Sequence, residues 1–195
     1  MNLVNRIKLE RYSKQELWSL FLTCAFPLHL WTLILAFRDI SWVTERTNAW
    51  DAVGVASYGM VFAFVESLLV FVVVALLGLL LPKHWESNRR LAFLSLLFLI
   101  TAIWAIISQL LFIWNIDLPP QAMLFLARSG HPLRWLYGGS YIVVFLTVLL
   151  PVYSFLRSNK LSLLILEFND RISLLTMFYL LFDLVGLIIV IIRNI

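Results

Sequence analysis

The chain has 195 residues, of which 62% are apolar and only 13% carry a charge. An average soluble domain has about a quarter of its residues charged, so this composition excludes an ordinary soluble protein. The 15% aromatic content, with 7 glycines and 6 prolines, also excludes disordered, collagen-like and linker-like chains. The composition predicts a membrane protein.

Five segments are long and apolar enough to cross a bilayer as helices, because a hydrocarbon core about 30 Å thick takes about 20 residues. These predicted spans are residues 17–37, 53–81, 91–115, 136–156 and 172–192. Barrel strands are excluded, since residues 68–81 lack the alternation of apolar and polar positions that a barrel strand needs. The sequence therefore predicts one all-α domain, residues 1–195, folded as a bundle of five transmembrane helices.

The limits of the first two spans carry local signals. Ser13 and Glu16 form a capping-box pattern, which predicts that the first helix begins there. The apolar run that follows exceeds the 7 to 15 residues of a signal-peptide core, so we interpret it as a retained span. Pro82 is expected to end the second span, because proline cannot continue a helix.

Two connections are too apolar for simple loops and too short to span. Residues 120–128 predict a short helix in the membrane interface, ended by Ser129-Gly130. Residues 160–168 are either a second interfacial helix or an extension of the fifth span. The polar pair Asn169-Asp170 favours a break, and thus a separate interfacial helix.

The distribution of basic residues predicts the orientation. Ten of the 15 lysine and arginine residues lie in the amino-terminal segment and in the second and fourth connections, and five lie on the opposite side. Basic residues favour the cytoplasmic side, so we expect the amino terminus inside and the carboxyl terminus outside, in a bacterial-type plasma membrane. The basic residues are dispersed, which excludes a nucleic-acid-binding patch and makes membrane lipids the expected partner.

Three ionisable residues lie near the middle of predicted spans: His29, Glu66 and Asp183. Such residues are costly in a membrane and are candidates for function. They form either hydrogen bonds between helices, with a carboxyl group kept neutral, or a path for protons or cations. A sequence does not give the order of helices, so it leaves open whether the three meet.

Small residues predict which face of the second span packs on protein. Ala52, Ala56, Gly59 and Ala63 recur at helical spacing, and Glu66 continues the same stripe. We therefore expect helix packing along this stripe and a Glu66 side chain that points into protein.

Motifs of membrane enzymes are absent: the sequence has no His-Glu-x-x-His, no Gly-x-Ser-x-Gly and no glycine-rich phosphate loop. Cys24 is the only cysteine, which excludes an intrachain disulfide or a cysteine pair for metal. We expect no cofactor and no metal site. Arg128, His131 and Arg134 are a candidate site for a lipid headgroup.

These observations favour a non-enzymatic helix-bundle subunit of a larger membrane assembly, docked on a second copy or on another membrane protein. Two alternatives stay open. One is a small proton or cation channel or transporter that uses the midspan carboxylates. The other is a protein that handles lipids or lipid-linked glycans.

Overall fold

The computed structural model describes residues 12–113 and 118–195, and within these ranges it has no strand. Its elements are α2 (Lys14–Arg46), α3 (Ala49–Leu77), the 3-10 helix η1 (Gly78–Leu80), α4 (Ser87–Ile113), α5 (Pro120–Arg128), α6 (Pro132–Arg157) and α7 (Asn159–Asn194). Five helices, α2, α3 with η1, α4, α6 and α7, are long and apolar enough to cross a membrane. The prediction of an all-α bundle with five spans is confirmed, and the apolar helices indicate a membrane location. The basic residues Arg6, Lys8 and Arg11 and the last two residues of the predicted span 91–115 lie outside the described residues.

Polar side chains set the ends of the first two helices. The backbone N–H of Ser13 donates to Glu16 Oε2 at 2.7 Å, and the N–H of Glu16 donates to Ser13 Oγ at 3.2 Å, so the predicted capping box is present. Asn48 caps α3 by accepting from the N–H of Asp51 at 2.9 Å. As expected from Pro82, the second span ends in η1 just before it.

The two short apolar connections behave differently. Residues 120–128 form α5, as predicted. The expected separate helix over 160–168 is wrong, because α7 runs without a break from Asn159 to Asn194. Asn169 does not interrupt the helix because its side chain is buried and donates to Ser95 Oγ of α4 at 2.6 Å. The polar group that suggested a break is instead part of a helix interface.

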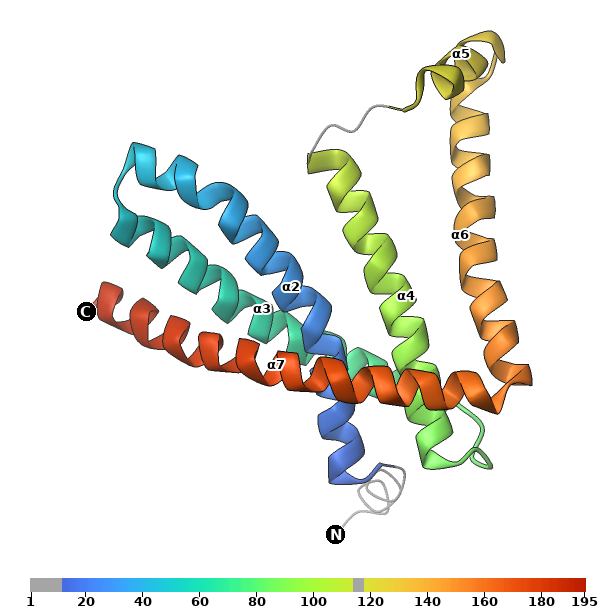
Figure 1. Ribbon diagram of the computed structural model, residues 1–195, viewed down its shortest axis with the longest axis horizontal. Coiled ribbons are helices and arrows are strands. Elements are labelled where there is room, and N and C mark those ends of the chain that lie inside the picture. Colours follow the sequence, from blue (N-terminus) through green and yellow to red (C-terminus); the bar gives the residue numbers. More distant parts are fainter. Residues whose placement is uncertain (1–11, 114–117) are drawn as a thin grey trace.

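The helices meet at one end and diverge toward the other. Figure 1 shows α2, α3 and α7 lying together along much of their length, while α4 and α6 extend away from them. The buried residues of α4 lie near its beginning, and Phe155, the buried residue of α6, lies near its end. The buried residues of α4 and Phe155 of α6 therefore lie at the end of the bundle where α7 begins. Away from that end, α4 and α6 separate from α7.

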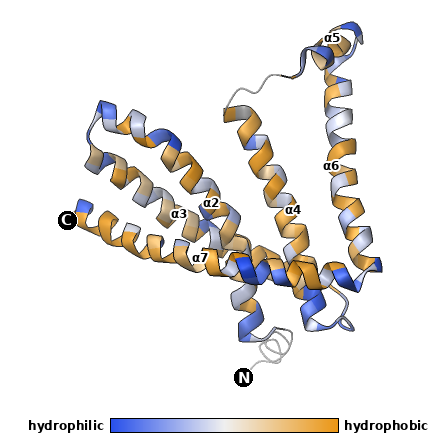
Figure 2. Ribbon diagram, in the orientation of Figure 1, coloured by the Kyte–Doolittle hydropathy of each residue, from blue (hydrophilic) through white to orange (hydrophobic). Residues whose placement is uncertain are grey.

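Two of the three apolar clusters form the core at this end. The largest buries residues of α2, α3 and α4: Leu20, Cys24, Val74, Leu91 and Leu94. A second joins Phe155 of α6 to Ala92 of α4 and Ile165 of α7. Farther along, α2, α3 and α4 diverge around an apolar cleft of ≈ 850 Å³. Figure 2 shows apolar residues over most of α4, α6 and α7, with polar residues near the helix ends and in a band within α7.

Candidate functional site

A buried histidine and a buried aspartate join α2 to α7. His29 is fully buried, and Asp183 is 7% exposed. Nε2 of His29 lies 2.9 Å from Oδ2 of Asp183, and Nδ1 of the same ring lies 2.8 Å from the carbonyl oxygen of Ala25. The structure thus brings together two of the three midspan residues that the sequence singled out.

The two ring contacts fix where the protons lie. A backbone carbonyl only accepts, so Nδ1 of His29 must carry a proton and donate it to Ala25. A proton must then also lie between Nε2 and the Asp183 carboxyl group, either on the ring or on the carboxyl oxygen. In either form, the pair is neutral overall and shares one proton, which suits a site in a membrane interior.

The surroundings of this pair are aromatic and closed. The ring of Tyr179 stacks on His29 with a centroid distance of 6.1 Å, and Phe26 stacks on Tyr179 at the same distance. Oδ1 of Asp183 is buried, and among the described residues nothing donates a hydrogen bond to it. The pair therefore joins two helices in an apolar setting, and one acceptor oxygen stays unused.

Further polar contacts follow the same face of α7. Asn169, Thr176 and Asp183 are spaced seven residues apart, and all three are buried. The Thr176 hydroxyl lies 3.1 Å from the carbonyl oxygen of Leu22 on α2. Near the carboxyl end of α7, a Cβ atom on Gly186 would lie 3.2 Å from the carbonyl oxygen of Ser57 on α3. One face of α7 thus contacts α4, α2 and α3 in turn.

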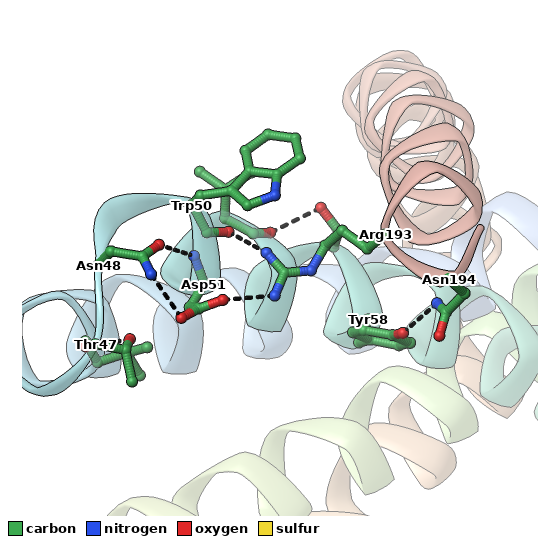
Figure 3. A network of polar contacts seen from close by, with 10 residues as sticks. Thr47, Asn48, Trp50, Asp51, Tyr58, Arg193 and Asn194 are labelled. Atoms are coloured by element: carbon green, nitrogen blue, oxygen red, sulfur yellow. Dashed lines mark hydrogen bonds and ion pairs between the residues drawn. The ribbon is translucent and has the colours of Figure 1, made fainter.

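The carboxyl end of α7 is tied to the beginning of α3. Figure 3 shows the Arg193 guanidinium reaching the Trp50 carbonyl oxygen and Asp51 Oδ1, both at 2.6 Å, and the Asn194 amide reaching the Tyr58 hydroxyl at 2.5 Å. A cation at a helix carboxyl end and an anion in a first helical turn both suit the helix dipole. This pair fixes α7 beside α3.

Glu66 does not join the His29–Asp183 pair. The sequence predicted that it points into protein, but the structure leaves it exposed at the rim of a groove between α2 and α3. Ser67, fully buried, occupies the inward position at this level and donates to the Ala63 carbonyl oxygen. Within residues 12–113 and 118–195, no hydrogen bond or ion pair reaches the Glu66 carboxylate.

The small-residue stripe of α3 lies against α2 of the same chain. Ala52 and Ala63 are buried, while Ala56 and Gly59 are partly buried and line the floor of the groove. A Cβ atom on Gly59 would lie 3.2 Å from Cγ2 of Thr32. The stripe therefore lets α2 and α3 approach closely, and a groove remains between the two helices.

Arg128 ends α5, and His131 and Arg134 lie at the beginning of α6, so the expected headgroup site stays a prediction. All three side chains are exposed, and in the described part of the chain none has a hydrogen bond or ion pair. Asp39, the acidic residue near the end of α2, accepts from its neighbour Arg38 at 2.6 Å. No group of three or more His, Cys, Asp or Glu residues is arranged to hold a metal ion within the described ranges.

Sequence reasoning missed the Ser95–Asn169 contact. Its signal was the seven-residue spacing that relates Asn169 to Thr176 and Asp183, which places all three on one helix face.

No family model, no curated protein and no solved structure matches the chain.

Proposed function

We propose that this protein is a non-enzymatic helix-bundle subunit of a larger membrane assembly. The observation that supports this function best is the exposure of α6. Only 6% of its most apolar stretch is buried, compared with 44% for α2. Helices in lipid are held together by close packing and hydrogen bonds, and α6 makes few of either with its own chain.

Few hydrogen bonds join α6 to the other described helices. Trp104 Nε1 of α4 donates to Thr147 at 3.0 Å, and Arg89 donates to the Leu156 carbonyl oxygen at 3.2 Å. Large side chains of α6 are exposed, among them Tyr141, 74% exposed, and Ile142, 62% exposed. A neighbouring membrane protein or a second copy that packs on such side chains would hold α6 in place.

Cross-linking tests this function directly. Cys24 is the only cysteine, so a Cys24→Ser chain accepts a single reporter at Ile142 of α6. We expect a cross-link from Ile142→Cys to another polypeptide in native membranes, and a matching complex after gentle extraction. A monomeric mass, with no cross-link from Ile142→Cys or from its neighbours on α6, would contradict the proposal.

We also propose that the amino terminus is cytoplasmic and the carboxyl terminus outside, in a bacterial-type plasma membrane. The uneven distribution of lysine and arginine supports this orientation.

A second candidate function is proton handling, supported by the shared proton of His29 and Asp183. Pumps and transporters build proton relays from these residue types. For this function, vesicles containing the purified chain should conduct protons, and Asp183→Asn should reduce the flux to that of empty vesicles. Equal flux with and without the wild-type protein would exclude it. Glu66→Gln is the matched control, because the structure places Glu66 apart from the pair.

A further inference from the structure

A groove of ≈ 360 Å³ runs along the outer side of the α2–α3 pair. Small residues form much of its floor, and larger side chains, among them Trp31 and Phe62, line its walls. Glu66, in the middle of the predicted span, lies at one end, and Asp39 lies toward the α2–α3 turn. The groove is therefore elongated, and it carries a carboxylate at the depth where the surrounding membrane is most apolar.

The Glu66 carboxylate is the unusual feature of this groove. Ionisable side chains within membrane spans nearly always pair with one another, with backbone groups or with water in a cavity. Within the described residues, Glu66 pairs neither with another ionisable side chain nor with a backbone group. Asp39, by contrast, is already bonded to Arg38. A cation or a strong hydrogen-bond donor is the chemical complement that Glu66 lacks.

The chain itself has no cation to offer at this depth. None of the five predicted spans contains a lysine or an arginine. His29 is the only histidine in a span, and its two ring nitrogens are already bonded to Ala25 and Asp183. A second copy of the chain would consequently bring no basic side chain to the level of Glu66.

We propose that the groove receives a transmembrane helix of a different polypeptide, which carries a lysine or an arginine at the depth of Glu66. This inference rests on the proposed subunit function and names the class of partner. The small residues of the floor let a helix backbone approach closely, and the ion pair fixes its register. A lipid chain would fill the apolar part of the groove but would leave Glu66 unpaired.

Association with a designed helix tests the proposal. The full chain is reconstituted in phosphatidylcholine bilayers with a leucine- and alanine-rich peptide of about 20 residues bearing one central lysine. A control peptide has leucine in place of the lysine. We expect energy transfer between labelled chain and labelled peptide to show about tenfold tighter association for the lysine peptide, in line with hydrogen bonds between membrane helices.

The variants make this test specific. Glu66→Gln keeps the shape of an exposed side chain and should abolish the preference for lysine. Glu167→Gln, an exposed carboxylate of α7 paired with Arg171, should retain it. Equal association of the two peptides, or a preference that survives Glu66→Gln, would overturn the proposal. So would Glu66-dependent binding of a small lipophilic amine without binding of the peptide.

Failure here is distinguishable from failure of the proposed function. If the complex extracted from native membranes has the same composition for wild type and for Glu66→Gln, this inference is wrong. The proposed subunit function would still hold. Loss of one polypeptide from that complex in Glu66→Gln, but not in Glu167→Gln, would identify the occupant of the groove.

Discussion

Asp183→Leu is expected to lower the free energy of unfolding by about 2 kcal/mol, because it leaves Nε2 of His29 buried without a partner. Asp183→Asn should cost less than about 1 kcal/mol, since its amide N–H donates to a neutral Nε2 while Nδ1 keeps its bond to Ala25. The measurement is reversible unfolding in bicelles, followed by tryptophan fluorescence.

A double-mutant cycle separates the pair from its surroundings. Combining Asp183→Leu with His29→Leu removes both partners, so the double variant should be more stable than the sum of the single effects predicts. Strictly additive effects, or an Asp183→Leu variant as stable as Asp183→Asn, would show that the 2.9 Å contact contributes nothing to the fold.

Gly186→Leu should lower the free energy of unfolding by about 3 kcal/mol, because overpacking a tight interface forces backbone shifts. A Cβ atom at this position would lie 3.2 Å from the Ser57 carbonyl oxygen and 3.5 Å from its Cα atom. Both atoms belong to the backbone of α3, which cannot move aside as a flexible side chain does. The substitution must therefore push α7 away from α3.

Gly138→Leu is the matched control for this substitution. Gly138 also lies within a long helix, α6, but a Cβ atom there would meet nothing within 4 Å. The free energy of unfolding of Gly138→Leu should lie within about 0.5 kcal/mol of the wild-type value, as is usual for substitutions away from packed features. Similar losses for the two variants would mean that glycine itself, and not the contact with Ser57, matters at position 186.

The sequence predicts the helices well because their signals are local. The five spans follow from unbroken apolar runs, and the first helix begins at the Ser13–Glu16 capping box that the sequence shows. The second span stops before Pro82, and α5 occupies the predicted residues. Each of these depends on neighbours within one or two helical turns.

Contacts between helices were predicted less well because they depend on helix order. Nothing along the chain indicates that His29 meets Asp183, 154 residues away. Asn169 suggested a break because asparagine is a weak helix former, but a partner on α4 keeps it within a continuous helix. The stripe predicts a protein-facing side as far as Glu66, whereas Ala63 is buried and Glu66 is exposed.

The polar face of α7 also has a consequence for biosynthesis. The ribosome makes α7 after every helix that it contacts, so the nascent α2 and α4 enter the membrane before their partners on α7 exist. At about 5 to 20 residues per second, the 154 residues from His29 to Asp183 take about 8 to 31 s to synthesise. During that time Nε2 of His29 has no Asp183 to bind, and the Ser95 hydroxyl has no partner until Asn169 is made. Insertion of the earlier helices and their final packing are thus separate events, and a ribosome stalled before α7 would hold an incompletely packed membrane intermediate.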